Sequence, residues 1–233
     1  MKCKEYYEQG ARFAKWRAVI KIDRQQGHPS DLAIEETAHS LARYAAICQA
    51  HGLVPIVEPE VLMDGDHDLC TAMNVTERVL KIVYGKLYAH RVFLEGTLLK
   101  PNMVLAGADC PTKYSPEEIA RATLQTLARA VPSAVPGIVF LSGGQSEEEA
   151  STNLYWINKL KTKDHPWALS FSYGRALQHS VLNAWKGSDD NKANAQLVLL
   201  KRAEACRDAA LGKESISANA GSKESTFIKD YKY

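Results

Sequence analysis

Lys100 is the residue of this sequence best suited to covalent chemistry. It ends an apolar stretch that we predict to be a buried strand, Phe93-Leu-Glu-Gly-Thr-Leu-Leu-Lys-Pro101. A lysine held partly out of water favours its neutral amine, which is a nucleophile for carbonyl carbons. The structural alternative is a lysine whose stem packs on apolar neighbours while its ammonium group reaches solvent. An isolated lysine favours that alternative, so the interpretation depends on the neighbouring strands.

Two other predicted strands carry charged residues at alternate positions. Lys15 and Arg17 belong to one strand, and Glu58 and Glu60 belong to the next. Because side chains alternate along a strand, the members of each pair share one face. Buried charges need partners or a ligand, so these four groups form either an ion-pair network or an active site. The presence of Lys100 on the following strand favours the active site.

These groups suit Schiff-base formation on a ketone. A neutral Lys100 would attack the carbonyl carbon, and loss of water from the resulting carbinolamine needs a general acid. Glu58 and Glu60 are both candidates for that acid. Lys15 would favour the neutral form of Lys100 by like-charge repulsion. The iminium product is an electron sink, which permits cleavage or formation of a neighbouring carbon–carbon bond.

Glycines after the fourth and fifth predicted strands indicate a phosphate site. One strand ends in Ser142-Gly-Gly-Gln145 just before a helix, and the other ends in Ser172-Tyr-Gly-Arg175. Backbone N–H groups exposed at such turns bind anions, and the guanidinium of Arg175 would clamp a phosphate. One such turn is weak evidence, but two at corresponding places predict a phosphorylated substrate.

Alternating strands and helices position these residues. We expect strands at 13–22, 53–60, 92–100, 137–142 and 167–173, and helices at 30–51, 70–89, from 115, 146–160, 175–185 and 191–211. Nearly continuous apolar strands predict a parallel sheet covered by helices, in either an open doubly wound fold or a (β/α)8 barrel. Polar residues at the C-terminal ends of all five strands favour the barrel. So does the lack of a Gly-x-Gly-x-x-Gly turn after the first strand.

Five strands do not close an eight-stranded barrel. We therefore expect residues 1–211 to form a partial (β/α)8 barrel, an α/β fold with about five βα units. Residues 212–233 are rich in Ser, Ala and Lys, and we expect them to form a flexible C-terminal tail.

Composition excludes several function classes. The chain has 233 residues and a net charge of +2, which argues against a nucleic-acid partner. No apolar run reaches the roughly 20 residues of a membrane helix, and the first residues lack a signal-peptide core. The five cysteines are scattered and form no CxxC pair, so we interpret them as reduced thiols of a cytosolic protein. The Asp64-Gly-Asp-His-Asp68 segment lacks the later ligands of a calcium loop and is expected to lead into a helix.

The motifs, in this order, resemble class I fructose-bisphosphate aldolase over essentially the whole chain. The matching segments are Ala14-Lys-Trp-Arg17, Ile56-Val-Glu-Pro-Glu60, Leu94-Glu-Gly-Thr-Leu-Leu-Lys-Pro-Asn102, Phe140-Leu-Ser-Gly-Gly-Gln-Ser-Glu-Glu-Glu-Ala150, Trp167-Ala-Leu-Ser-Phe-Ser-Tyr-Gly-Arg-Ala-Leu177 and Asp230-Tyr-Lys-Tyr233.

The resemblance implies a role for each site residue. Lys100 would be the Schiff-base lysine, Lys15 and Glu58 its acid/base partners, and Glu60 a close neighbour. The other implied residues are the terminal Tyr233, which would assist proton exchange on the enamine, Arg17 beside the catalytic groups, and the 1-phosphate site formed by Ser142, Gly143, Gly174 and Arg175.

The resemblance also implies a lyase of glycolysis and gluconeogenesis. Its substrate would be fructose 1,6-bisphosphate, a phosphorylated sugar, and its products dihydroxyacetone phosphate and glyceraldehyde 3-phosphate. It would need no cofactor or metal, contact no membrane, and act as a cytoplasmic homotetramer.

Residues 1–233 correspond to only part of the family's chain, which begins about a third of its length earlier. An aspartate and a lysine of that earlier part have no counterpart in this sequence. We therefore expect this polypeptide alone to be poorly stable and nearly inactive. Two alternatives are a transaldolase-like Schiff-base barrel and a non-catalytic fragment or pseudoenzyme.

Overall fold

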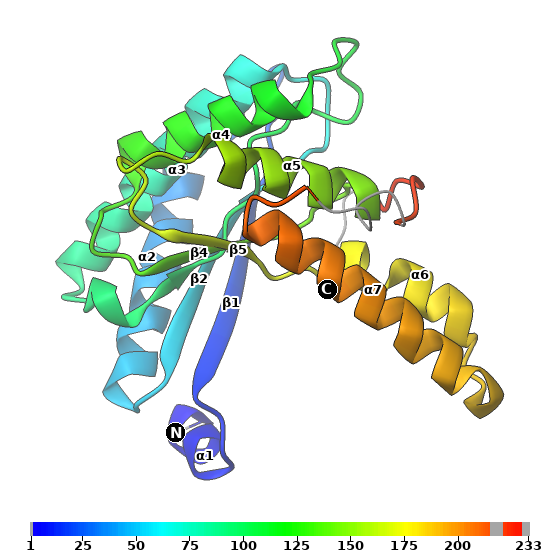
Figure 1. The fold of residues 1–233 in the computed structure, drawn as a ribbon. Helices are drawn as coiled ribbons and strands as arrows, with labels where there is room; N and C mark the ends of the chain where they lie inside the picture. Colours follow the sequence, from blue (N-terminus) through cyan, green and yellow to red (C-terminus); the bar gives the residue numbers. More distant parts are fainter. Residues whose placement is uncertain (1, 215–220, 230–233) are drawn as a thin grey trace.

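Five parallel strands form a single sheet in the computed structural model, which describes residues 2–214 and 221–229 (Figure 1). The strands follow one another across the sheet in chain order. Their bounds are β1 Phe13–Ile20, β2 Val54–Val61, β3 Leu98–Leu99, β4 Gly137–Phe140 and β5 Ala168–Phe171. This order and direction confirm the prediction of an α/β fold with five parallel βα units.

Helices α2 Asp31–Ala50, α3 Leu69–Ala89, α4 Pro116–Ala130 and α5 Glu147–Leu160 connect the strands and cover one side of the sheet (Figure 1). Helix α1 Lys2–Glu8 precedes the first strand, and α6 Arg175–Trp185 and α7 Lys192–Ala210 follow the last. The ribbon shows α6 and α7 as a pair that extends away from the sheet. All but α1 were predicted from the sequence with nearly these bounds.

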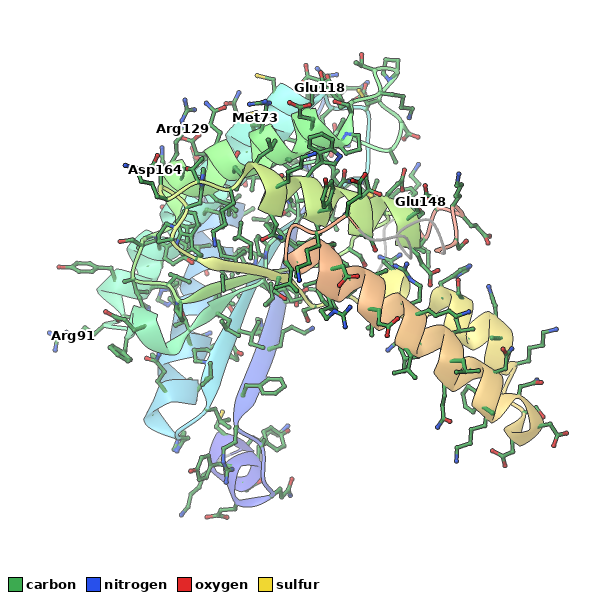
Figure 2. All side chains as sticks on the ribbon, viewed as in Figure 1. Met73, Arg91, Glu118, Arg129, Glu148 and Asp164 are labelled. Atoms are coloured by element: carbon green, nitrogen blue, oxygen red, sulfur yellow. The ribbon has the colours of Figure 1, made fainter. Side chains whose placement is uncertain are left out.

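Side-chain caps fix where the helices begin. The side chains of Ser115 and Ser146 each accept a hydrogen bond from the backbone N–H of the third residue of their helix. That third residue is a glutamate, whose side chain accepts a hydrogen bond from the backbone N–H of the serine. Asp68 caps α3 by accepting from Thr71 N at 2.8 Å. Each cap satisfies an amide that the helix itself leaves unpaired, so these local signals set the boundaries. In Figure 2, Glu118 lies at the N-terminal end of α4 and Arg129 near its C-terminal end, as the helix dipole favours.

The predicted strand over 92–100 is wrong in its first part. Leu94–Gly96 form a 3₁₀ helix, and only Leu98–Leu99 pair as a strand. The side chain of Gln49 on α2 explains the difference, because its amide binds Phe93 N at 3.0 Å and Phe93 O at 2.7 Å. With these backbone groups satisfied by a helix side chain, the segment needs no neighbouring strand.

The core lies between the sheet and helices α2 to α5. Its fully buried members include Ile34 and Leu41 of α2, Leu80 of α3, Leu99 of β3 and Ile138 of β4. These residues come from the apolar stripes of the helices and the outer face of the strands. The opposite face of β1 and β2 carries the charged residues of the site.

The two ends of the sheet are strands β1 and β5. On β1, Phe13, Trp16 and Val19 are 64%, 52% and 45% exposed.

Within the described residues, no helix combines the length and apolar content that a membrane span requires.

Part of the predicted tail lies against the body of the protein. Thr226 Oγ1 donates to Gln145 O at 2.7 Å, and Ser225 Oγ donates to Gly144 O at 3.2 Å. The division into a partial barrel at 1–211 and a flexible tail at 212–233 stays a prediction.

Candidate active site

Glu58 joins the two lysines that the sequence singled out. Its Oε1 lies 3.2 Å from Lys100 Nζ, and its Oε2 lies 3.3 Å from Lys15 Nζ. Glu58 is 1% exposed and Lys100 is 8% exposed, so this contact is shielded from bulk water. Lys15, whose side chain is one-third exposed, forms the open side of the cluster. A carboxylate between two amines at these distances can move a proton to or from either of them.

The parallel pairing of the strands accounts for this arrangement. Arg17 is the register partner of Glu58, and Leu99 is the partner of Val57. Lys100 follows directly, and its amide donates to Val57 O at 2.8 Å, so sheet pairing continues to this residue. Three adjacent strands therefore bring one carboxylate and two amines together. Only Lys100 follows the end of its strand, because Lys15 and Glu58 lie within β1 and β2, not at the C-terminal ends that the sequence predicted.

A second ion pair lies beside the first. Arg17 Nε donates to Glu60 Oε2 at 2.6 Å, and both side chains are at least nine-tenths buried. A short, charge-assisted hydrogen bond of this kind fixes the guanidinium plane. The sequence left an ion-pair network and an active site as alternatives, and the four charges do form ion pairs around Lys100.

A cavity of about 240 Å³ opens onto these groups. Its lining includes Glu58, Glu60, Arg17 and Lys100 on one side, and Ser142, Gly143, Gly174 and Arg175 on the other. Eight of the ten predicted site residues therefore line this cavity. Lys15 is not among the lining residues, but its amine contacts Glu58, which is. Ser172, Gln178 and Leu141 also line the cavity, and no role was predicted for them.

The loop after β4 supplies backbone groups at the far wall of this cavity. Gly143 has φ +58°, a conformation that side chains other than glycine rarely adopt. Gly144 must also lack a side chain, because a Cβ would lie 2.7 Å from both Met63 Sδ and Phe227 Cβ. The shape of this turn thus depends on two glycines for two different reasons, one conformational and one steric.

Gly174 and Arg175 begin α6 on the same wall. No atom lies within 4 Å of the place where a Cβ of Gly174 would stand, so the backbone is open to a ligand. Arg175 Nη1 donates to Thr226 O at 2.6 Å, which ties the cation to the described part of the tail. Tyr173 supports the turn by donating to Ala150 O, and burial raises its pKa well above 10, so it stays a neutral donor.

Sequence reasoning missed the polar residues that hold this wall in shape. Asn102 Oδ1 accepts from Val61 N at 2.9 Å, which links the end of β2 to the segment after Lys100. Gln145 donates to Ser142 O at 3.0 Å and accepts from Asn153 at 2.8 Å. Asn102 and Gln145 stand in the segments quoted for the resemblance, but their burial comes from contacts distant in sequence. Tyr233 lies outside the described residues, so its predicted role is untested.

Comparison with known proteins identifies the family. The family model described as fructose-bisphosphate aldolase class-I matches residues 1–233. The chain is 59% identical over 233 residues to fructose-bisphosphate aldolase 1 of Toxoplasma gondii, covering all of this chain and 64% of that protein. It is 58% identical over 234 residues to the cytosolic fructose-bisphosphate aldolase 4 of Arabidopsis thaliana, of which it covers 59%.

A solved structure of fructose-bisphosphate aldolase from Plasmodium falciparum, in complex with TRAP and a small-molecule inhibitor, has the same fold. It superposes with a TM-score of 0.90 at 58% identity, over 92% of this chain and 61% of that chain. Its likeness supports the interpretation of the five-stranded sheet as part of an aldolase barrel. The chain spans 59% to 64% of the length of these two curated relatives. Together these matches show that the chain belongs to the class I fructose-bisphosphate aldolase family.

Proposed function

We propose that this chain carries the Schiff-base centre of a fructose-bisphosphate aldolase. The reaction is the reversible cleavage of fructose 1,6-bisphosphate to dihydroxyacetone phosphate and glyceraldehyde 3-phosphate. The observation that carries the proposal is the buried Glu58 carboxylate, 3.2 Å from Lys100 Nζ and 3.3 Å from Lys15 Nζ.

Lys100 is the nucleophile in this mechanism. Its amine gives up a proton to Glu58 and attacks the ketone carbon, which forms a carbinolamine. The same carboxyl group returns the proton to the carbinolamine oxygen, and water leaves as the iminium forms. Lys15, bound to the other Glu58 oxygen, orients the carboxylate and keeps positive charge near the amine. The iminium then accepts the electron pair of the carbon–carbon bond that breaks.

The opposite wall of the cavity would hold a substrate phosphate. Ser142 and Gly143 offer a hydroxyl and backbone N–H groups, and Gly174 leaves its backbone open. Arg175 supplies the permanent positive charge that matches a phosphate dianion. We assign Arg17 and Glu60 to substrate positioning beside the catalytic lysine, and Tyr233 to proton exchange on the enamine.

The remaining assignments follow from relatives. Two curated relatives are named as cytosolic or cytoplasmic isozymes, so we propose a cytoplasmic location. We also propose that the enzyme acts in glycolysis and gluconeogenesis and that the complete barrel assembles as a homotetramer. Size-exclusion chromatography with light scattering would test the assembly state.

Borohydride trapping tests the Schiff base. Purified residues 1–233 are incubated with fructose 1,6-bisphosphate, reduced with sodium borohydride, digested and mapped by mass spectrometry. We expect a covalent adduct on Lys100 that is absent from Lys100→Met and retained in Lys213→Met, an exposed control. A folded protein that yields no adduct on Lys100 would contradict the proposal and favour a non-catalytic fragment.

A turnover assay separates formation of the Schiff base from the complete reaction. We expect the adduct to form while cleavage of the bisphosphate by residues 1–233 stays far below that of a full-length relative. Cleavage at the rate of a full-length relative would contradict the expected impairment and leave the Schiff base supported.

A further inference from the structure

Helix α1 rests on the body of the protein through one face. It has only seven residues, and a helix this short is not stable in water without tertiary contacts. Within Lys2–Glu8, Cys3 is the one residue that is not exposed. Tyr7, one turn later, faces Gly52 at the end of α2, where a Cβ would lie 3.1 Å from the tyrosine ring. The face of α1 that carries Cys3 and Tyr7 therefore packs on the C-terminal end of α2.

Cys48 lies under that face. It is fully buried in the last turn of α2, four residues before Gly52 in the chain. Cys3 and Tyr7 lie one turn apart on the same face of α1, so Cys3 also faces this end of α2. The Cys3 thiol is one of the neighbouring groups that raise the pKa of Cys48. Cysteine side chains of two separate elements thus meet at the contact that holds α1 in place.

We propose that Cys3 and Cys48 form a redox-active dithiol, which a small-molecule disulfide such as oxidised glutathione converts to an intramolecular disulfide between α1 and α2. The reaction is thiol–disulfide exchange in two steps. The Cys3 thiolate attacks the small disulfide, forms a mixed disulfide and releases one thiolate. The Cys48 thiolate then attacks the Cys3 sulfur and releases the second small thiol, so two protein thiols are oxidised as one disulfide is reduced.

The surroundings of the two thiols set this order. Burial and the nearby Cys3 thiol raise the pKa of Cys48 to about 11, so little of it is thiolate at neutral pH. Cys3 is partly exposed and can be reached by a reagent from solvent. Because the thiolate is the attacking species, Cys3 reacts first and Cys48 resolves the mixed disulfide.

The dithiol is connected to the catalytic strand. Cys48 contacts Tyr44, and the Tyr44 hydroxyl donates to the carbonyl oxygen of Ala14 on β1. Ala14 directly precedes Lys15, whose amine binds Glu58. Oxidation of Cys48 therefore occurs on the helix that supports the first strand of the site.

The other cysteines provide controls. Cys70 is exposed on α3, and its sulfur accepts from Asn74 of the same helix. Cys206 is buried beside Ser151 and Arg202 instead of a second thiol. We therefore expect selective pairing of Cys3 with Cys48.

Peptide mapping without reductant tests the site. The purified protein is incubated with oxidised glutathione, its remaining thiols are blocked, and the digest is analysed by mass spectrometry. We expect loss of two of the five free thiols and one linked peptide pair that contains Cys3 and Cys48. The link should be absent from Cys3→Ser and Cys48→Ser and present in Cys70→Ser. A parallel sample in denaturant shows which pairs form without the fold.

Two results would overturn the proposal. One is a stable glutathione adduct on Cys3 in the wild type with no link to Cys48. The other is a mixture of pairings that is the same with and without denaturant.

Hydrogen exchange measures the structural consequence. We expect the amides of α1 to exchange at least tenfold more slowly after oxidation and to return to the original rate when dithiothreitol is added. Unchanged exchange in a sample that carries the link would overturn the claim that the disulfide fixes α1 to α2.

Discussion

Arg202 and Glu147 form a buried charged pair, with Arg202 Nε 3.6 Å from Glu147 Oε2 and both residues at most 1% exposed. Arg202 Nη2 also donates to Glu147 O and to Ala176 O. The carboxylate accepts from Ser180 N and Ser222 N, both at 2.9 Å. One pair thus joins α5, α6, α7 and the described part of the tail, next to the cavity wall that carries Arg175.

Arg202→Met should destabilise the protein strongly. The substitution keeps the apolar stem but leaves the Glu147 charge buried without its cation, which costs about 3–5 kcal/mol in comparable sites. Urea unfolding followed by circular dichroism measures the change. Arg207→Met on the same helix is the matched control, because the Arg207 side chain is 62% exposed and its loss should change stability by about 0.5 kcal/mol or less. Equal effects of the two substitutions would contradict the structural role of the pair.

Gly85→Ala should stabilise the protein. Gly85 lies within α3, away from its ends, on the face exposed to solvent. No atom lies within 4 Å of the position that a Cβ would take there. Alanine is favoured over glycine in such helices by about 0.5–1 kcal/mol. Thermal unfolding measures the gain. Gly107→Ala is the contrasting variant, since its Cβ would lie 2.1 Å from Gly65 O and must lower the melting temperature.

Local signals in the sequence were enough to predict most helices. The caps at Ser30, Ser115 and Ser146 act within three residues of chain, so their effect can be read directly. The site could be predicted for a similar reason, because Lys15, Glu58 and Lys100 belong to adjacent parallel strands and share one face of the sheet. Strand periodicity and strand order together imply the contacts that the structure contains.

Contacts between distant parts of the chain explain what the sequence did not reveal. The 3₁₀ helix at Leu94–Gly96 depends on Gln49, and α1 depends on the packing of its Cys3 face on α2. The burial of Glu147 on α5 depends on its ion pair with Arg202 of α7. In each case a partner over forty residues away determines the conformation.

Replacement of Phe13 by lysine should reduce self-association of residues 1–233. Phe13 is 64% exposed on β1, at one end of the sheet, and an edge strand with apolar side chains pairs readily with another chain. Phe13→Lys places a charge on that edge. Dynamic light scattering over a concentration series measures association. Leu32→Lys on α2 is the control, because Leu32 is 71% exposed but lies on a helix, and it should leave association unchanged.

Stability should fall below about pH 6.5, partly because of His67. Burial lowers the pKa of His67, which is 1% exposed. The unfolded chain therefore takes up a proton on this residue at a higher pH than the folded chain does. Acidification through the ordinary histidine range, about 6.5, then favours unfolding, and above that range the effect is absent. Urea midpoints at pH 8 and pH 5.5 measure the difference, which should be smaller in His67→Gln. An equal difference in that variant would exclude His67 as a cause.

Glu58→Gln should slow Schiff-base formation by about 10²- to 10⁴-fold. The amide keeps the size of the carboxylate, so the cavity retains its shape, but it can no longer accept a proton from Lys100 or return one to the carbinolamine oxygen. The rate at which borohydride traps the adduct on Lys100 measures this step directly. Glu36→Gln, an exposed substitution on α2, is the control and should react like the wild type. A Glu58→Gln protein that forms the adduct at the wild-type rate would show that another group transfers the proton, and Glu60, which lines the same cavity, is the next candidate.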